Sequence, residues 1–198
     1  MAQENNNIRL ITFQDVIVTT TLESYSAYES QKEYIGFTEK MLFDKFKARM
    51  KAALKIDPNR NIYPIWCWIP KKDEKFEDDE TIRNYMELST PKGDNIEVLE
   101  LSVPKEFVFV SNFDLWNEYR FKVRFETGGV ITDAQINKLF EKQKGARLQA
   151  AIPIITKDHI IKRKLLYDPM EFDYSETEAT ILNRQQSGEI IIDSNGYF

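Results

Sequence analysis

The stretch Ile96–Trp116, IEVLELSVPKEFVFVSNFDLW, constrains the fold more than any other part of the chain. It contains two strand-like apolar runs, Glu97–Val103 and Phe107–Val110, separated by a short turn. The segment Ile62–Ile69, IYPIWCWI, has comparable apolar density. Short apolar runs bounded by turn residues are typical of buried strands, so these segments predict the centre of one mixed sheet. Pro64 indicates that its strand lies at an edge or carries a bulge.

Helical patterns lie between the predicted strands. Thr38 can serve as the N-cap of a helix that ends at Leu54. Its apolar residues share one face: Met41, Leu42, Phe46, Met50 and Leu54. A later helix begins with a capping box formed by Thr132 and Gln135. The shorter predicted elements are helices over Glu80–Leu88 and Asn112–Tyr119 and a strand over Phe121–Phe125, FKVRF.

Further strands are predicted over Ile8–Phe13, Arg147–Ile155 and Glu189–Ile192. The segment Gln14–Tyr34 leaves two alternatives open: a strand that gives way to a helix near Thr21, or one helix that tertiary contacts enforce against propensity. For Thr156–Leu166 we predict a short helix or a turn. Together these elements predict one α+β domain with a mixed, mostly antiparallel sheet flanked by helices. We expect it to span residues 8–168, between a flexible N-terminus (1–7) and a C-terminal extension (169–198) of undecided packing.

Length and charge narrow the class of protein. A chain of 198 residues buries enough surface to form one domain without a metal or a disulfide. Its net charge of −5 argues against a broad nucleic-acid-binding face. No apolar run reaches the roughly 18–20 residues that span a membrane, and the start MAQENNNIRL lacks the pattern of a secretory signal. We therefore expect a cytoplasmic protein with no membrane contact.

Few residues suit catalysis or metal binding. The single cysteine, Cys67, excludes internal disulfides and cysteine metal clusters, and its place between two tryptophans is typical of a small buried apolar residue. The single histidine, His159, lies in a polar stretch and is expected at the surface. The acidic run 73–80 lacks the calcium-loop pattern, and neither GxxxxGK nor GxGxxG occurs. We expect no cofactor and no metal.

The motif SNFDLW is the most informative candidate site. It places Asp114 between Phe113 and Trp116, and an aromatic environment would disfavour the charged form of this carboxyl. In one interpretation, Asp114 caps the following turn or meets an arginine, while the rings fill the core. In the other, Asp114, Trp66 and Trp68 form the wall of a ligand pocket.

Two motifs, YPIWCW at Tyr63–Trp68 and LELSVPKEFVFVSNFDLW at Leu99–Trp116, resemble the bacterial family of domain of unknown function 3841. The segments RLQAAIPIITKDHI, from Arg147, and ITFQ, at Ile11–Gln14, are similar to further parts of that family. The resemblance covers residues 8 to about 166. It implies a compact α+β intracellular domain without an established activity. The opening strand, with T-x-Q before a helix, is also similar to ADP-ribosyltransferase-like folds.

For function we favour a non-catalytic interaction module that binds a protein partner through an aromatic-rich surface, since the sequence shows no nucleophile–base pair, metal cluster or phosphate loop. The alternative is a nucleotide- or NAD-using enzyme of ADP-ribosyltransferase-like type, with Glu100 or Asp114 as the acid/base group. A second alternative is a nucleic-acid binder that uses the basic cluster 157–164. The candidate ligand-binding residues are Thr12, Gln14, Trp66, Trp68, Asp114 and Trp116.

These hypotheses make different geometric demands. The enzyme requires Thr12, Trp68 and one carboxylate to converge in a single concave pocket. A nucleic-acid binder requires a continuous basic face. An interaction module requires neither, and exposed aromatic side chains would favour it.

Overall fold

The computed structural model describes residues 6–30, 39–89, 95–126, 129–141 and 145–167. The chain divides into two units, 1–165 and 166–198, and the description below concerns the first together with the last residues of its final strand. Several predicted features lie outside the described residues: the Thr38 cap, the Glu189–Ile192 strand and the extension 169–198. The predicted domain boundaries stay a prediction.

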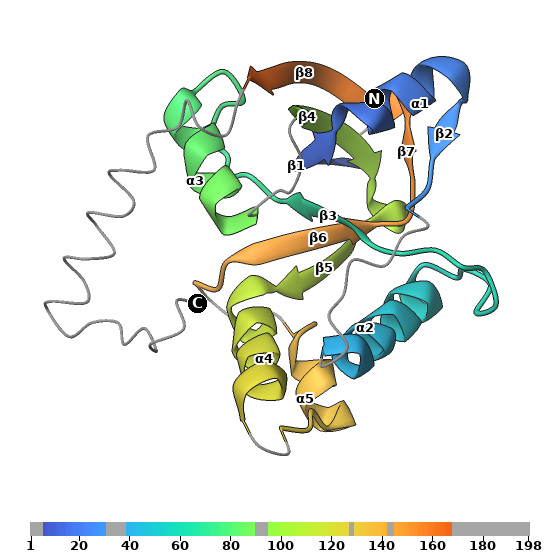
Figure 1. The fold of residues 1–198 in the computed structure, drawn as a ribbon, viewed down its shortest axis with the longest axis vertical. Helices are drawn as coiled ribbons and strands as arrows, with labels where there is room; N and C mark the ends of the chain where they lie inside the picture. The colour runs from blue at the N-terminus through green and yellow to red at the C-terminus, as the bar shows by residue number, and fades with distance from the viewer. Residues whose placement is uncertain (1–5, 31–38, 90–94, 127–128, 142–144, 168–198) are drawn as a thin grey trace, which may run out of the picture. The chain divides into compact units, whose positions relative to one another are not determined.

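The core of the fold is a six-stranded sheet with the order β5-β6-β3-β1-β4-β8 (Figure 1). Its strands are β1 (Asn7–Asp15), β3 (Ile65–Trp68), β4 (Asn95–Pro104), β5 (Phe109–Asn112), β6 (Leu148–Ile152) and β8 (Ile160–Tyr167). A separate pair is formed by β2 (Ala27–Tyr28) and β7 (Ile155–Thr156). The pairings β1–β3, β1–β4, β3–β6 and β5–β6 are all antiparallel. The predicted α+β class with a mostly antiparallel sheet is confirmed.

The centre of this sheet differs from the predicted one. The strand β1 lies between β3 and β4, so the two most apolar segments of the sequence are not neighbours. The prediction that Pro64 marks an edge or a bulge is also wrong, because β3 pairs on both sides and begins at Ile65, just after the proline. A proline at that position removes no hydrogen bond from the ladder.

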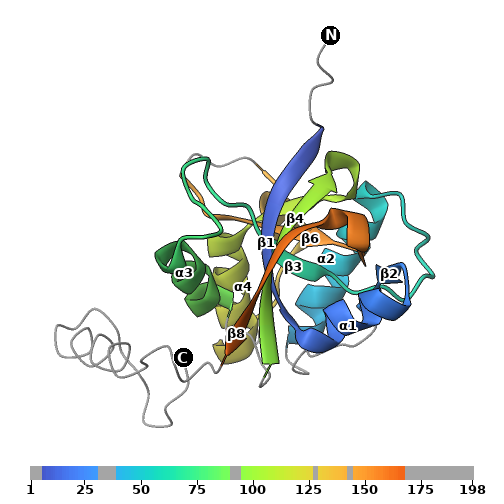
Figure 2. The same ribbon diagram turned by 90° about the horizontal axis from the view of Figure 1, so that it is seen from above.

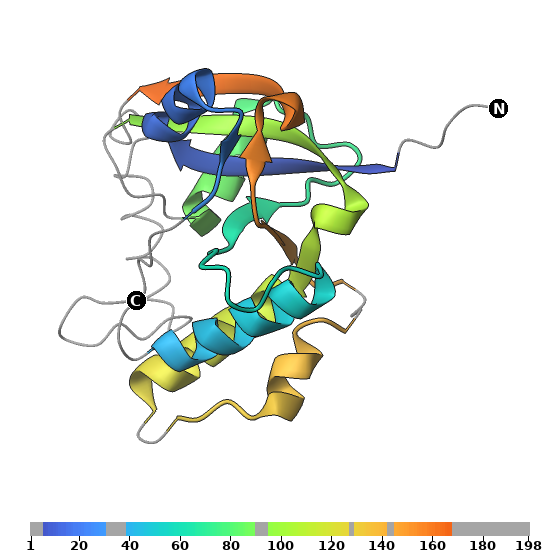
Figure 3. The ribbon, with the colours of Figure 1, turned by 90° about the vertical axis from the view of Figure 1, so that its right-hand side faces the viewer.

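Five helices accompany the sheet: α1 (Val16–Ser24), α2 (Lys40–Ala53), α3 (Asp79–Ser89), α4 (Phe113–Phe125) and α5 (Asp133–Lys138), within the described residues. Two 3₁₀ turns, Lys105–Phe107 and Lys157–His159, connect strands. Helices α2, α4 and α5 lie together next to β3, β5 and β6 (Figure 3). Helices α1 and α3 lie on opposite sides of β1 and β4 (Figure 2).

Each face of the sheet has its own core. On one face, α1 buries Val18 and Leu22 against Leu10, Leu99 and other aliphatic residues of the strands. The other face, under α2, α4 and α5, is rich in aromatic residues, including Phe46, Trp116 and Tyr119. Since side chains alternate along a strand, consecutive residues of β3, β5 and β6 contribute to different cores.

Local signals at the helix ends are partly confirmed. The capping box of Thr132 and Gln135 is present at the start of α5. The strand-then-helix alternative for the segment after Phe13 is correct in kind, but the change comes at Asp15, whose carboxylate accepts a hydrogen bond from the Ile17 amide (2.9 Å). In α2, Met41 is 45% exposed rather than part of the buried stripe.

Two elements have the wrong predicted type. The alternating FKVRF segment continues α4 as helix instead of forming a strand, because Val123 follows Trp116 and Tyr119 at helical spacing into the same core. The segment predicted as a helix or turn after Thr156 forms the 3₁₀ turn and then β8. Pairing with β4 there overrides local preference, as often happens in sheets.

Candidate interaction surface

The predicted site residues Trp66 and Trp116 belong to an aromatic cluster in the interior. Their ring centroids lie 5.3 Å apart, and both rings contact Phe46, which is fully buried. Only 3% of Trp116 is exposed, while Trp66 is half-buried. Tilted and edge-on contacts of this kind stabilise a core. These two tryptophans therefore join β3 and α4 to α2.

Trp68 lies in a different group on the same face of the sheet. Its ring meets Phe113 edge-on at 4.6 Å and stacks on Tyr85 of α3 at 5.5 Å. Its indole nitrogen Nε1 donates a hydrogen bond to Ser89 Oγ (2.6 Å). With 6% of the residue exposed, no face of this ring is open to stack on a ligand.

Thr12 and Gln14 project from the opposite face. Ile11 pairs directly with Trp68, so the next residue, Thr12, points away from it. Thr12 Oγ1 donates to the Trp66 carbonyl (2.7 Å) and accepts from Gln14 Nε2 (2.6 Å). The sheet separates Thr12 from Trp68, so the pocket that the enzyme hypothesis requires is not formed by these residues.

Cys67 and His159 have environments that do not activate them. Burial raises the pKa of the Cys67 thiol to about 12, and a hydrogen bond with Thr12 offsets this only in part, so the thiol is protonated at neutral pH. Burial lowers the pKa of His159, whose Nδ1 accepts a hydrogen bond from the Thr156 amide (3.3 Å). His159 is half-buried at its turn rather than fully at the surface.

Asp114 meets an arginine, as one of the two interpretations proposed. Arg147 donates to it from Nε (2.7 Å) and from its backbone amide (3.1 Å). The Asp114 side chain is 43% exposed, so the expected aromatic enclosure of the carboxylate is wrong. Asn112, not Asp114, caps α4 by accepting from the Leu115 amide (3.1 Å). In the first turn of α4, the negative charge of Asp114 is also favoured by the helix dipole.

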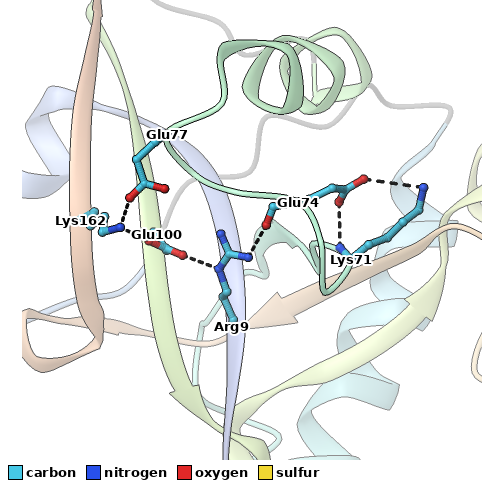
Figure 4. A network of polar contacts seen from close by, with 6 residues as sticks. All are labelled: Arg9, Lys71, Glu74, Glu77, Glu100 and Lys162. Atoms are coloured by element: carbon cyan, nitrogen blue, oxygen red, sulfur yellow. Dashed lines mark hydrogen bonds and ion pairs between the residues drawn. The ribbon is translucent and has the colours of Figure 1, made fainter.

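Glu100, the other carboxylate considered for catalysis, lies in a charge network that joins three strands to a loop (Figure 4). Arg9 of β1 pairs with Glu100 and also donates to the Glu74 carbonyl (2.6 Å). Lys162 of β8 pairs with Glu77 and lies 3.8 Å from Glu100. Only 6% of the Glu100 side chain is exposed, and a cation lies at each of its oxygens. This arrangement holds the loop before α3 against the sheet.

The basic cluster 157–164 is likewise engaged internally. Lys157 Nζ donates to the Glu23 carbonyl (3.1 Å), and Arg163 lies 3.6 Å from the Glu23 carboxylate. Lys164 pairs with Asp79. The hydrogen bond between Lys162 and Glu77 raises the pKa of Lys162 and lowers the pKa of Glu77. Acidic groups interleave with the cations, so the described residues of this cluster form no continuous basic face.

The outer face of α4 presents aromatic residues that the core does not use. Phe121 is 58% exposed and Phe125 is 48% exposed, and their ring centroids lie 4.9 Å apart. At helical spacing both point away from Trp116 and Tyr119, which face the sheet. Exposed single apolar residues are common, but two phenylalanine rings in contact at the surface are a typical feature of docking sites.

Cations frame this aromatic pair. The Arg124 guanidinium lies 5.7 Å from the centre of the Phe125 ring. Glu39 is buried and holds Arg120 at 3.3 Å and Arg124 at 3.8 Å. Lys122 makes no ion pair with the residues that the structure describes.

The chain after α4 lies against the end of the helix. The Gly129 amide donates to the Glu126 carbonyl (2.9 Å), and a Cβ at Gly129 would lie 2.2 Å from the Lys122 carbonyl oxygen. Only glycine fits such a close approach. The next residue, Val130, is 56% exposed. We call Phe121, Lys122, Arg124, Phe125 and Val130 the α4 surface.

Comparison with known families gives one match. The family described as Domain of unknown function (DUF3841) matches residues 9–159. The chain belongs to this family. The matched region contains all of α4 and the predicted site residues, and ends where β8 begins. No curated protein and no solved structure matches the chain significantly.

Three further observations bear on function. Within the described residues, three or more potential metal-binding side chains do not come together, and none of the helices is both long and apolar enough to cross a membrane. An open hollow on the outside of α2 is lined by Lys40, Met41, Asp44, Lys45 and Ala48. None of the predicted site residues lines it.

The α4 surface was missed because FKVRF was assigned to a strand. Extending the helical spacing of Trp116, Tyr119 and Val123 would have placed both phenylalanines on the outward face of the helix.

Proposed function

We propose that this domain is a protein-interaction module and that the α4 surface is its docking site. The observation that carries the proposal is the pair of exposed, mutually contacting rings of Phe121 and Phe125 on the outward face of a helix. The predicted interaction through an aromatic-rich surface is retained, but with these phenylalanines in place of the tryptophans.

The energetics favour docking at this pair. A partner that covers a phenylalanine side chain removes apolar area from water, which is worth about 1.5–3 kcal/mol per fully buried ring. Arginine and aromatic residues are also over-represented in the central part of protein interfaces. Because Glu39 restrains Arg120 and Arg124 in the free protein, less side-chain entropy is lost when a partner binds beside them.

The composition of the α4 surface indicates the chemistry of the partner. The two rings require an apolar side chain opposite them. The half-exposed Arg124 and Lys122, which has no ion pair with a described residue, favour a neighbouring carboxylate. We therefore expect a protein segment that carries apolar residues flanked by aspartate or glutamate.

The test compares proteins captured by the unmodified protein and by two double variants. Phe121→Ser with Phe125→Ser removes the aromatic pair, while Ile17→Ser with Tyr25→Ser removes two even more exposed apolar residues from the region of α1. We expect a partner that is retained by the unmodified protein and by the α1 control and lost from the α4 variant. A purified partner should then bind more weakly to Arg124→Glu.

Two results would contradict the proposal. One is an α4 variant that retains every protein bound by the unmodified chain. The other is a clear rise in melting temperature of the unmodified protein with a nucleotide or NAD⁺, since a ligand at about 100 times its Kd adds about 2.7 kcal/mol of stability. That result would favour the enzyme alternative instead.

A further inference from the structure

The outer edge of β8 is a second candidate interface, independent of the α4 surface. Strand β8 ends the sheet order, and within the part of the chain that the structure describes β4 is its one neighbour. Among the described residues, the backbone of 160–167 makes one hydrogen bond outside the strand ladders, from the Ile160 amide to the Lys157 carbonyl of the preceding 3₁₀ turn. An edge strand of this kind offers a row of amide and carbonyl groups to an additional strand.

The side chains along this edge are charged alike on both faces. Lys162 and Lys164 contact Glu77 and Asp79 on the side of α3, while Arg163 contacts Glu23 of α1 on the other side. These three cationic side chains are 47%, 45% and 56% exposed, and the preceding Ile161 is 51% exposed. A strand added here would meet positive charge at three successive positions.

The charge of the edge selects among possible occupants. A second copy of β8 would bring like charges close together across the new pairing, which is destabilising. The internal acidic partners Glu23, Glu77 and Asp79 are themselves 67%, 60% and 74% exposed. Exposed ion pairs contribute little to stability, so carboxylates from another chain can share these cations at small cost. Ile161 supplies an apolar contact beside them.

We infer that the free edge of β8 binds an extended acidic segment of a partner protein as an additional strand of the sheet. Backbone hydrogen bonds supply part of the affinity in this mode, and alternate side chains of the added strand supply specificity. The acidic residues of the segment lie opposite Lys162, Arg163 and Lys164. The inference does not depend on α4, so failure of either proposal leaves the other standing.

The experiment measures binding of labelled synthetic peptides of about ten residues, long enough for an ordinary strand, by fluorescence anisotropy. In the first peptide three consecutive glutamates are flanked by valines, so that a glutamate can lie opposite each of Lys162, Arg163 and Lys164. In the second, the same sequence is N-methylated at alternate amides on one edge, which removes the hydrogen-bond donors and keeps the charge. A third has lysine in place of glutamate. The full chain is used throughout, and amide hydrogen exchange of residues 160–165 reports pairing directly.

We expect the acidic peptide to bind, to slow exchange along β8, and to lose about tenfold or more in affinity on N-methylation. Arg163→Glu with Lys164→Glu should weaken the acidic peptide similarly and bind the lysine peptide instead. This exchange of preference cannot come from unfolding. Phe121→Ser with Phe125→Ser should leave binding of the acidic peptide unchanged.

Other outcomes would overturn the inference. Equal binding of the N-methylated peptide would show simple charge attraction without strand pairing. Loss of peptide binding in the α4 variant would place the peptide on the α4 surface. Tighter binding of a single-stranded RNA at the same salt concentration would identify the cluster as a nucleic-acid site, and a dimer that shields β8 would identify a second copy as the occupant.

Discussion

The two faces of α4 carry the same kinds of residue but differ in exposure. The inward face places Trp116 and Tyr119 against the sheet, where each is 3% exposed. The outward face places Phe121 and Phe125 in solvent, with about half of each exposed. The inward rings contact α2 and β3, whereas each outward ring has the other as its aromatic neighbour. Aromatic content alone therefore does not indicate burial; the angular position on the helix does.

The largest effect should come from the inward face. Trp116→Ala removes a ring that contacts Phe43, Phe46 and Trp66. We expect a loss of about 3–5 kcal/mol in the free energy of unfolding, because a large cavity replaces a packed indole. Urea denaturation followed by circular dichroism measures it. A loss below about 1 kcal/mol would mean that the aromatic cluster does not support the fold.

Gly129→Ala should have the next largest effect. A methyl group there would overlap the Lys122 carbonyl oxygen, and backbone of a helix end cannot move aside easily. We expect about 1–3 kcal/mol of destabilisation, the usual cost of overpacking. Gly145→Ala is a comparison with a different cause: the added Cβ has open space around it, but the positive φ of 82° is itself strained for alanine. A Gly129→Ala variant as stable as the unmodified protein would show that the Cβ does not clash with the Lys122 carbonyl oxygen.

Asp114→Asn tests the start of α4. The substitution keeps the size of the side chain and removes the charge that pairs with Arg147. Because the pair is exposed, we expect less than about 1 kcal/mol of destabilisation. Melting temperatures of the variant and the unmodified protein in low and high salt measure the destabilisation. High salt should reduce the difference between the two melting temperatures. A variant that folds normally but loses a ligand would instead revive the hypothesis that Asp114 is functional.

Tyr119 gives the inward face a dependence on alkaline pH. Burial raises the pKa of Tyr119 above its ordinary value of 10, and the nearby Glu118 and Glu141 raise it further. The unfolded chain therefore loses this proton first, and stability falls as pH rises through 10. Tyr119→Phe should reduce the slope of unfolding free energy against pH above 10. Equal slopes of unfolding free energy against pH for the Tyr119→Phe variant and the unmodified protein would contradict the raised pKa of Tyr119.

The smallest effect on stability should come from the outward face. Phe121→Ser with Phe125→Ser removes rings that lie in solvent, so we expect the free energy of unfolding to change by no more than about 0.5 kcal/mol per site. Thermal unfolding measures this, with Trp116→Ala as the reference. A loss of unfolding free energy as large as that of Trp116→Ala would mean that both faces of α4 stabilise the fold to the same extent.

Local patterns predicted several features correctly. The capping box of Thr132, the inert Cys67 and the α+β class follow from side-chain chemistry and from spacing within a few residues of one another. The groups involved are close together in the sequence, so they are in contact whatever fold the rest of the chain adopts. The resemblance to the DUF3841 family belongs here too, since the family match over residues 9–159 confirms membership.

Other features depend on contacts between distant segments, and local patterns could not predict them. The strand β8 exists because β4 pairs with it, and the cations of β8 form exposed ion pairs with Glu23, Glu77 and Asp79 from distant segments. The sheet also separates Thr12 from Trp68, since Ile11 is the residue that pairs with the tryptophan. Composition and periodicity carry information about residues that are close in the sequence. Strand register and long-range ion pairs depend on which distant segments come together when the chain folds.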